Sequence, residues 1–358
     1  MRIRRRGIFV VALVLVLMTF ILLMLSSSRP NVDVFASSQM LAERFSVIQP
    51  VRIIPPALLA SFTCERMDAE TRKRMLQTYA FPFAELDAVK TPEDMEFLRV
   101  QTRYPFDIAS LDHGDLITRT LKSKGVWESH KIKFIEGVAD KMNEHGKPTS
   151  AMTFVDVGAN IGAIGFVARS MGMRTFMVEP VEMHIAMIRS TAIRNDFIDP
   201  TRFFILPFAF GNDTGTSTIQ IIHSNHGGST LVPEKVAIEK ANIESTQLVR
   251  LEQLDDWINF PVDILKIDVE GFEKCVIEGA LRLFYHKRVK YVIMEVWWNI
   301  PLCNSAVGMF EWLVIQGYTI YTESEWEQAI ARVPPKIQWK DQPQNRNGFS
   351  DWIMVRNE

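Results

Sequence analysis

Phe154-Val155-Asp156-Val157-Gly158-Ala159-Asn160-Ile161-Gly162 is the stretch of sequence that decides the fold. A β-rich run leads directly into a glycine-containing turn, and a helical pattern follows the turn. Gly158 allows a sharp turn, Gly162 allows close packing where the helix starts, and the first N–H groups of a helix can bind a ligand. The stretch therefore predicts a strand, a ligand-binding turn and a helix.

A carboxylate follows the next predicted strand. Glu179 comes directly after Thr175–Val178, at the distance past Gly158 (about 20 residues) where an acidic side chain binds both hydroxyls of a ribose. Asn160 breaks the G-x-G-x-x-G pattern of dinucleotide sites, and Asp156 repels phosphate. The Asp156 carboxylate instead suits the ammonium group of S-adenosylmethionine, so this cofactor is predicted.

The expected cofactor site combines this turn with the end of the third predicted strand. Ala209 and Phe210 follow that strand, and Phe210 could pack on the adenine ring or equally be a core residue. The complete set of expected cofactor-binding residues is Asp156, Gly158, Asn160, Gly162, Glu179, Ala209 and Phe210.

Around this stretch, residues 153–296 alternate short β-rich runs with helical runs, which predicts a parallel sheet covered by helices. The expected strands are 153–157, 175–178, 203–207, 262–267, 289–295, 319–322 and 351–356. The expected helices are 161–171, 181–195, 272–284 and 306–316, with a further amphipathic helix between 125 and 146. The segment between the third and fourth strands is expected to be irregular, and residues 333–348 to form a long loop.

The fourth strand ends in a second polar motif, Leu265-Lys266-Ile267-Asp268-Val269-Glu270-Gly271. Ligands of parallel sheets bind outside the carboxyl ends of the strands, so these side chains should lie near Gly158 and Glu179. Lys266, Asp268 and Glu270 are the expected catalytic residues, able to orient an acceptor hydroxyl, take its proton and stabilise charge. The reaction needs no metal, although Asp268 and Glu270 could hold Mg²⁺.

Three weaker candidates lie near the same edge. His226 stands in a glycine-containing loop and is either a base or a solvated histidine. Glu295, Trp297 and Trp298 follow the fifth strand, where aromatic rings suit a sugar but are also ordinary packing.

Three ordered motifs resemble the FkbM-type methyltransferases: residues 155–162, Glu179-Pro180, and residues 265–273 with Gly279-Ala280. Residues 115–128, ending in Gly125-Val126-Trp127-Glu128, also look like the segment before the first strand of that family. The resemblance implies an α/β, Rossmann-like class I methyltransferase fold, a seven-stranded, mostly parallel sheet whose last strand is antiparallel, with helices on both faces. It also implies S-adenosylmethionine as cofactor and O-methylation, often of a sugar-containing acceptor.

The amino terminus predicts the subcellular location of the protein. Arginines at positions 2 and 4–6 precede an uncharged apolar run, 7–25, about the 20 residues that a helix needs to cross a bilayer. Positive residues stay cytosolic, so the rest of the chain is expected in the lumen of the Golgi or endoplasmic reticulum as a type II membrane protein. A cleaved signal peptide is the alternative, because Ser26 to Ser28 are small enough for a signal peptidase.

Composition agrees with one sizeable catalytic domain. The chain has 358 residues, 47% of them hydrophobic, and a net charge of −2, which gives no reason to expect nucleic acid as a partner. Three cysteines, Cys64, Cys275 and Cys303, allow at most one internal disulfide, and Cys275 is interpreted as a small core residue. The expected segments are a cytosolic tail (1–6), an anchor (7–25), a stem (26–90), a helical extension (91–150) and the catalytic domain (151–358).

A methyltransferase acting on a lumenal glycan, glycolipid or glycoprotein is therefore the favoured function. A type II glycosyltransferase shares the anchor and the sheet, but the Asp-x-Asp pair of such enzymes does not occur in the sequence. A lumenal binding protein without catalytic activity is the third hypothesis.

Overall fold

The computed structural model describes residues 95–111, 115–222, 228–232, 243–297, 306–336, 340 and 349–357. All of them belong to the compact unit Ala69–Glu358. The expected anchor 7–25 and stem 26–90 lie outside the described residues, as do His226 and Trp298. Within the described ranges, no helix combines the length and apolarity that a membrane crossing requires.

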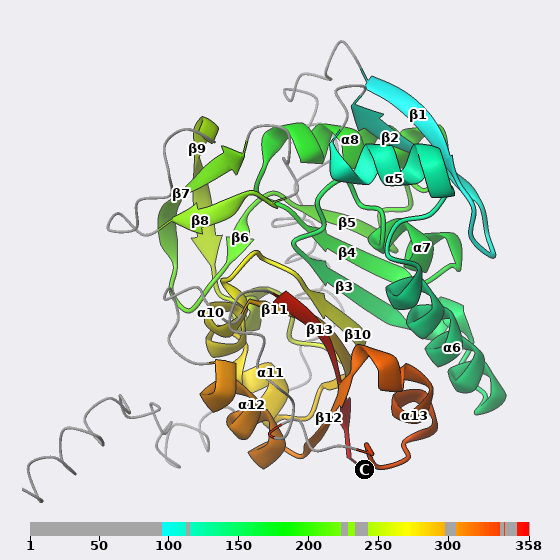
Figure 1. The fold of residues 1–358 in the computed structure, drawn as a ribbon, viewed down its shortest axis with the longest axis vertical. Coiled ribbons are helices and arrows are strands. Elements are labelled where there is room, and N and C mark those ends of the chain that lie inside the picture. Colours follow the sequence, from blue (N-terminus) through cyan, green and yellow to red (C-terminus); the bar gives the residue numbers. More distant parts are fainter. Residues whose placement is uncertain are drawn as a thin grey trace, which may run out of the picture. The chain divides into compact units, whose positions relative to one another are not determined.

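The central feature is a seven-stranded sheet with the order β12-β13-β11-β10-β3-β4-β5 (Figure 1). Its strands are β3 (Thr153–Val157), β4 (Arg174–Val178), β5 (Phe203–Leu206), β10 (Val262–Ile267), β11 (Val289–Trp297), β12 (Tyr318–Thr322) and β13 (Phe349–Arg356). Neighbouring pairs from β5 to β11 are parallel, whereas β13 is antiparallel to both β11 and β12. The predicted mostly parallel sheet with an antiparallel last strand is thus confirmed.

Helices cover both faces, as predicted (Figure 1). The helices on one face are α6 (Ser129–Glu144), α7 (Gly165–Ser170) and α8 (Glu182–Arg194), and those on the other are α10 (Glu273–Glu278), α11 (Leu281–Tyr285) and α12 (Ala306–Ile315). Alternate strand residues enter opposite cores: Phe154 packs in the first and Val155 in the second, because successive side chains of a strand point to opposite faces.

Two expected helices are shorter than the sequence pattern suggests. The helix expected from residue 161 begins only at Gly165, because Asn160 and Gly162 have positive φ values that interrupt helical geometry. The helix expected over 272–284 is divided at Gly279, where an added Cβ would lie 2.0 Å from the carbonyl oxygen of Gly211.

The extension 91–150 is not wholly helical, which corrects the prediction. It begins with a hairpin, β1 (Met95–Val100) and β2 (Phe106–Leu111), followed by α5 (Leu116–Lys124), α6 and a short 3-10 helix (Thr149–Ala151). Side chains of α8 bind β2: the Asn195 side chain accepts from the Asp107 N–H, and Thr191 from the Ala109 N–H. The hairpin therefore belongs to the wall of the catalytic domain.

The segment expected to be irregular forms a second sheet, which is a further correction. Its order is β6-β9-β7-β8, with β6 (Ala209–Phe210), β7 (Gly215–Ile222), β8 (Thr230–Val232) and β9 (Ile243–Glu252), and α9 (Leu254–Trp257) follows it. β7 and β9 consist almost wholly of exposed and half-buried residues, so their sequences lack the apolar runs that mark buried strands. The expected loop after residue 333 is preceded by a 3-10 turn (Glu323–Glu325) and α13 (Trp326–Ala331), which packs on α6.

Candidate active site

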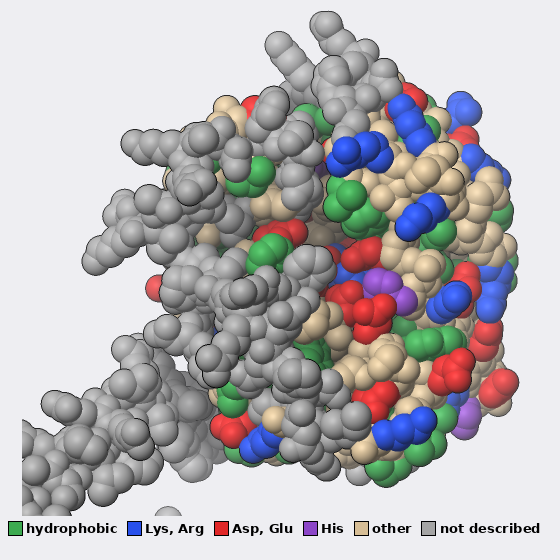
Figure 2. All heavy atoms as spheres, viewed as in Figure 1, with side chains coloured by type: hydrophobic (Ala, Val, Ile, Leu, Met, Phe, Trp, Pro, Cys, Tyr) green, Lys and Arg blue, Asp and Glu red, His purple; other side chains and the backbone are tan. Residues whose placement is uncertain are grey.

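A cavity of about 600 Å³ lies at the edge where the parallel strands end. The ends of β3, β4, β10 and β11 reach this edge, and so does the beginning of β13, because that strand runs the opposite way. Glu295 near the end of β11 thus stands opposite Asp351 near the start of β13. Acidic side chains gather beside a histidine in the middle of the face shown in Figure 2.

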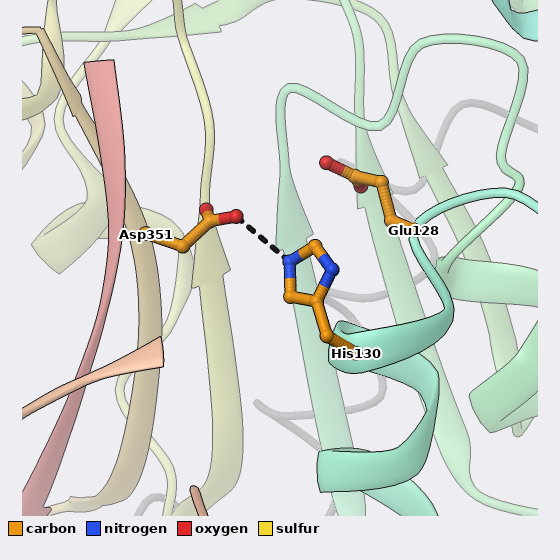
Figure 3. A group of neighbouring side chains, drawn as sticks. All are labelled: Glu128, His130 and Asp351. Carbon is orange, nitrogen blue, oxygen red and sulfur yellow. Dashed lines mark hydrogen bonds and ion pairs between the residues drawn. The ribbon is translucent and has the colours of Figure 1, made fainter. Parts of the chain in front are cut away.

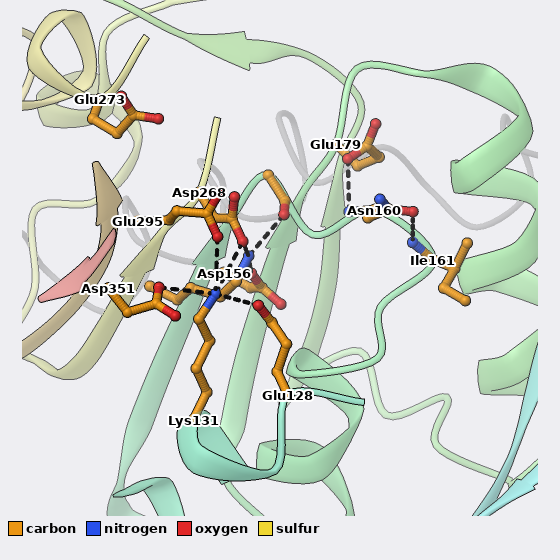
Figure 4. Close-up of polar contacts among 12 residues, drawn as sticks. Glu128, Lys131, Asp156, Asn160, Ile161, Glu179, Asp268, Glu273, Glu295 and Asp351 are labelled. Atoms are coloured by element: carbon orange, nitrogen blue, oxygen red, sulfur yellow. Dashed lines mark hydrogen bonds and ion pairs between the residues drawn. The ribbon is translucent and has the colours of Figure 1, made fainter. Parts of the chain in front are cut away.

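The turn after β3 is held in place by the next strand. The N–H groups of Gly158 and Ala159 both donate to the Val178 carbonyl, 3.0 Å away in each case. The N–H of Asn160, whose φ is +53°, donates to Glu179 Oε2 at 2.8 Å (Figure 4). Turn and carboxylate, predicted from two separate motifs, are therefore one structural unit.

Glu179 is buried except for the part that lines the cavity. Its Oε1 accepts hydrogen bonds from the Val181 N–H at 3.0 Å and from His184 Nδ1 at 3.2 Å. A carboxylate has about four lone-pair positions, and these three hydrogen bonds leave one of them, on Oε2, for a ribose hydroxyl. The position of Glu179 therefore fits a contact with one ribose hydroxyl.

Lys266 is fully engaged beneath the turn. Its Nζ donates to the Gly158 carbonyl at 2.9 Å and lies 3.0 Å from Asp156 Oδ1 and 3.4 Å from Asp268 Oδ2. Burial opposes its charge, but Asp156 and Asp268 outweigh burial and raise the pKa of Lys266 above its usual value. Lys266 therefore stays charged and fixes the turn relative to β10.

A second buried lysine lies at the centre of the acidic side chains, and the sequence reading did not identify it. Lys131, on α6, has a side chain that is 1% exposed. Its Nζ pairs with four carboxylates, Glu128, Asp268 (3.4 Å), Glu295 (3.6 Å) and Asp351 (3.2 Å), as Figure 4 shows. Burial would raise the pKa of Asp268, but Lys266 and Lys131 together hold it below its usual value.

At Glu270 and Glu295 the charge of Lys131 does not offset burial. Burial, reinforced by the charges of Asp268 and Glu295, raises the pKa of Glu270 to about 9. Burial and the charge of Asp268 raise the pKa of Glu295 to about 8. Near neutral pH, Asp268 is therefore ionised, while Glu270 and Glu295 keep their protons.

Next to Lys131, His130 turns its ring towards the start of β13 (Figure 3). Its Nε2 lies 2.8 Å from Asp351 Oδ2, and its Nδ1 lies 3.5 Å from Glu323 Oε1. Burial would lower the pKa of His130, but the hydrogen bond to Asp351 and the charges of Asp351 and Glu323 together outweigh burial and raise it. His130 and Asp351 both line the cavity.

Most of the predicted site residues meet in this cavity. Those that line it are Gly158, Asn160, Glu179, Ala209, Phe210, Lys266, Asp268, Glu270, Glu295 and Trp297. Asp156 and Gly162 do not: Asp156 is fully buried as the partner of Lys266, and Gly162 (φ +87°) packs against Phe166. The expected direct contact between Asp156 and a cofactor is therefore replaced by a supporting role through Lys266.

Five residues that were not expected at the site also line the cavity: Trp127, Glu128, His130, Glu323 and Asp351. One available signal was Gly125-Val126-Trp127-Glu128, which resembles the family segment before the first strand. Within the described residues, Glu128 forms two groups that could hold a metal ion, one with His130 and Asp351 and one with Asp268 and Glu295. The suggested Asp268 and Glu270 pair is not among them, and Lys131 pairs with every carboxylate of both groups.

The profile of the family described as "Methyltransferase FkbM domain" matches residues 156–320, from the turn to β12. The chain contains an FkbM methyltransferase domain. Such a domain uses S-adenosylmethionine, and the described residues suit this cofactor: Glu179 is available to a ribose, and the acidic edge suits a ligand with ammonium and sulfonium charges.

Several solved structures described as methyltransferases match this chain at low sequence identity. The FkbM methyltransferase of Methylobacillus flagellatus is 14% identical, with a TM-score of 0.36, over 68% of this chain and 62% of that one. This chain therefore spans less than two thirds of that protein. The N-terminal domain of human METTL16, solved in complex with S-adenosylhomocysteine, is 14% identical, with a TM-score of 0.33, over 77% of this chain and 94% of that domain. A search of curated protein sequences found no match.

Proposed function

We propose that this chain transfers the methyl group of S-adenosylmethionine to a hydroxyl group of a glycan, glycolipid or glycoprotein in the secretory lumen. The observation that carries the proposal is the single cavity in which the Glu179-supported turn faces the charged edge of β10, β11 and β13. The sulfonium already activates the methyl group, so the protein mainly has to align the acceptor and remove its proton.

The two ends of the cavity suit two ligands. The turn, Glu179 and the pair Ala209-Phe210 form the end for the cofactor. Trp127 and Trp297 line the cavity as well, and an aromatic ring can stack on the apolar face of a sugar. Lys266 fixes Asp268 next to Gly158, so the two ends meet at this carboxylate.

Two observations support a location in the secretory lumen. Cys275 is disulfide-bonded rather than a free core cysteine, and disulfides persist mainly in oxidising compartments. Asn212, in the glycosylation pattern Asn212-Asp213-Thr214, is exposed at the start of the loop before β7. Together with the apolar run 7–25, these features favour a type II membrane protein of the Golgi or endoplasmic reticulum.

The activity test uses the full-length protein in detergent. Titration calorimetry should detect S-adenosylmethionine and S-adenosylhomocysteine but not UDP-sugars. With tritiated methyl donor, label should pass to a pool of methyl glycosides of glucose, galactose, mannose and fucose. Binding of UDP-glucose in place of the methyl donor would instead favour a glycosyltransferase. Cofactor binding without methyl transfer to any glycoside would contradict the proposal that the acceptor is a sugar hydroxyl.

The lumenal location and the membrane anchor are tested in microsomes. The described domain should resist added protease until detergent is present, and Asn212→Gln should remove an endoglycosidase-sensitive mass shift. Deletion of residues 1–25 should abolish association with carbonate-washed membranes. Protease digestion of the domain in intact microsomes would place it on the cytosolic side and end the lumenal proposal.

A further inference from the structure

His130 and Asp351 come from distant parts of the sequence and meet at the acceptor end of the cavity. His130 lies in the first turn of α6, and Asp351 lies near the start of β13. The His130 side chain is 32% exposed and the Asp351 side chain 10%, and both line the cavity. A buried carboxylate thus orients a more accessible imidazole.

The hydrogen bond fixes which ring nitrogen can react. An ionised carboxylate only accepts, so Nε2 of a neutral His130 must carry the hydrogen that bonds Asp351 Oδ2 at 2.8 Å. The lone pair then belongs to Nδ1, on the side of the ring away from Asp351 (Figure 3). Such an imidazole is prepared to take a proton, because Asp351 also stabilises the imidazolium that results.

A chain of contacts connects this histidine to the cofactor end of the cavity. Asp351 binds His130 through Oδ2 and lies 3.2 Å from Lys131 through Oδ1. Lys131 pairs with Asp268, and Asp268 pairs with Lys266, which binds the Gly158 carbonyl. The position of His130 is therefore set by the same buried network that positions the turn.

Five ionisable groups in or beside the cavity are poorly suited to take a proton near neutral pH. Lys131 and Lys266 are held as cations by the carboxylates around them. Asp268 is stabilised as an anion between the two lysines, which makes it a weak base. Glu270 and Glu295 already carry protons.

We propose that His130, oriented by Asp351, is the general base of the methyl transfer, an inference that rests on the proposed function. The acceptor oxygen forms a bond to the methyl carbon as the carbon–sulfur bond breaks, and that electron pair stays on sulfur. The hydroxyl proton passes to Nδ1 of His130 and is later released to water. No further reactant is needed.

The charged groups around His130 determine its pH dependence. Asp351 of β13 and Glu323 of the 3-10 turn after β12 face its two nitrogens. Lys131 adjoins it on α6, and Glu128 lies directly before that helix. The two carboxylates raise the pKa of His130 and Lys131 lowers it, with a net increase. The transfer rate should thus increase with pH through a pKa above the ordinary value for histidine, about 6.5.

The test compares His130→Gln, Asp351→Asn and a control, His145→Gln, at the exposed opposite end of α6. The full-length protein is assayed with tritiated methyl donor and the glycoside pool, and calorimetry with S-adenosylhomocysteine reports the cofactor site. His130→Gln should lose on the order of 10² to 10⁴ in rate, with unchanged cofactor affinity. His145→Gln should match the parent.

Asp351→Asn adds a measurement that a purely structural role would not change. Without the carboxylate charge, the pKa of His130 falls, so the acid limb of the rate profile should move to lower pH while the maximal rate decreases. Parental rates in His130→Gln, or an acid limb that stays in place in Asp351→Asn, would overturn the inference alone. Absence of transfer by the parent protein would overturn the proposed function, and the inference with it.

Discussion

Gly158 and Asp268 touch backbone to backbone: a Cβ placed on Gly158 would lie 1.8 Å from the carbonyl oxygen of Asp268. The contact joins the turn after β3 to the end of β10, and the Asp268 N–H donates to the Val157 carbonyl at 3.0 Å. Gly158 also has a φ of +78°, which side-chain-bearing residues rarely adopt. The cofactor turn and the charged edge are thus packed together at a position that only glycine fits.

Gly158→Ala should therefore damage both the fold and cofactor binding. Gly172→Ala is the matched control, because Gly172 has a similar φ of +87° but nothing within 4 Å of an added Cβ. The control should lose roughly 1–2 kcal/mol, the cost of the left-handed backbone alone. Chemical denaturation should show a clearly larger loss for Gly158→Ala. Equal losses would mean that the backbone contact is not tight in solution.

The second prediction concerns Glu179, which supports the turn and faces the cavity. Glu179→Ala should weaken S-adenosylhomocysteine binding by about 1.5–3 kcal/mol, because hydrogen bonds to charged groups are the strong ones. Calorimetry measures the change, and Glu182→Ala, at an exposed position of α8, serves as the control. If Glu179→Ala folds and binds with parental affinity, the ribose lies elsewhere.

Fully buried strands could be predicted from the sequence, whereas exposed strands could not. Strands such as 153–157 and 262–267, buried at every position, are apolar enough to be recognised and have these bounds in the structure. β7 and β9 of the second sheet each have only one buried residue, so their sequences resemble loops. The break at Gly279 depends on its contact with Gly211, which no local pattern contains.

The site residues were likewise predictable only in part. Glu179 and Asp268 follow parallel strands, and the rule that ligands bind at the carboxyl ends of such strands predicted their place. Asp351 escaped that rule because β13 is antiparallel, so its first residues reach the edge. Lys131 is one of three lysines in α6, and lysines between apolar helix positions are usually typical of a solvated helix face. Only the tertiary structure shows four carboxylates around it.

A third prediction follows from the protons on Glu270 and Glu295. Each pKa is raised, so each proton is bound at pH 7 before the cofactor binds, and a nearby positive charge should lower both values. S-adenosylmethionine should therefore release protons on binding. S-adenosylhomocysteine, which lacks the sulfonium charge, should release fewer. Calorimetry in buffers of different ionisation enthalpy measures the difference, and equal release by the two ligands would contradict it.

The last prediction distinguishes Asp268 from Glu270, two carboxyls of one motif that differ in protonation. Asp268 is ionised at pH 7 between Lys131 and Lys266, so Asp268→Asn removes a charge that both lysines use. Lys131 keeps three other carboxyl partners, and Lys266 keeps Asp156, so the variant should fold. Its transfer rate should nevertheless fall by an order of magnitude or more, about 1.4 kcal/mol per tenfold, because the network that positions the acceptor is altered.

Glu270→Gln replaces one neutral group by another at pH 7, since the pKa of Glu270 is about 9. Its rate should stay within about twofold of the parent at pH 7, a difference of about 0.4 kcal/mol in the barrier. Above pH 9 the parent acquires a charge that the variant lacks, so the two rates should separate only there. Rate profiles of both variants from pH 6 to pH 10, with the glycoside pool as acceptor, provide the measurement. A large loss in Glu270→Gln at pH 7 would show that Glu270 works as a charged base, and parental activity in Asp268→Asn would show that its charge is dispensable.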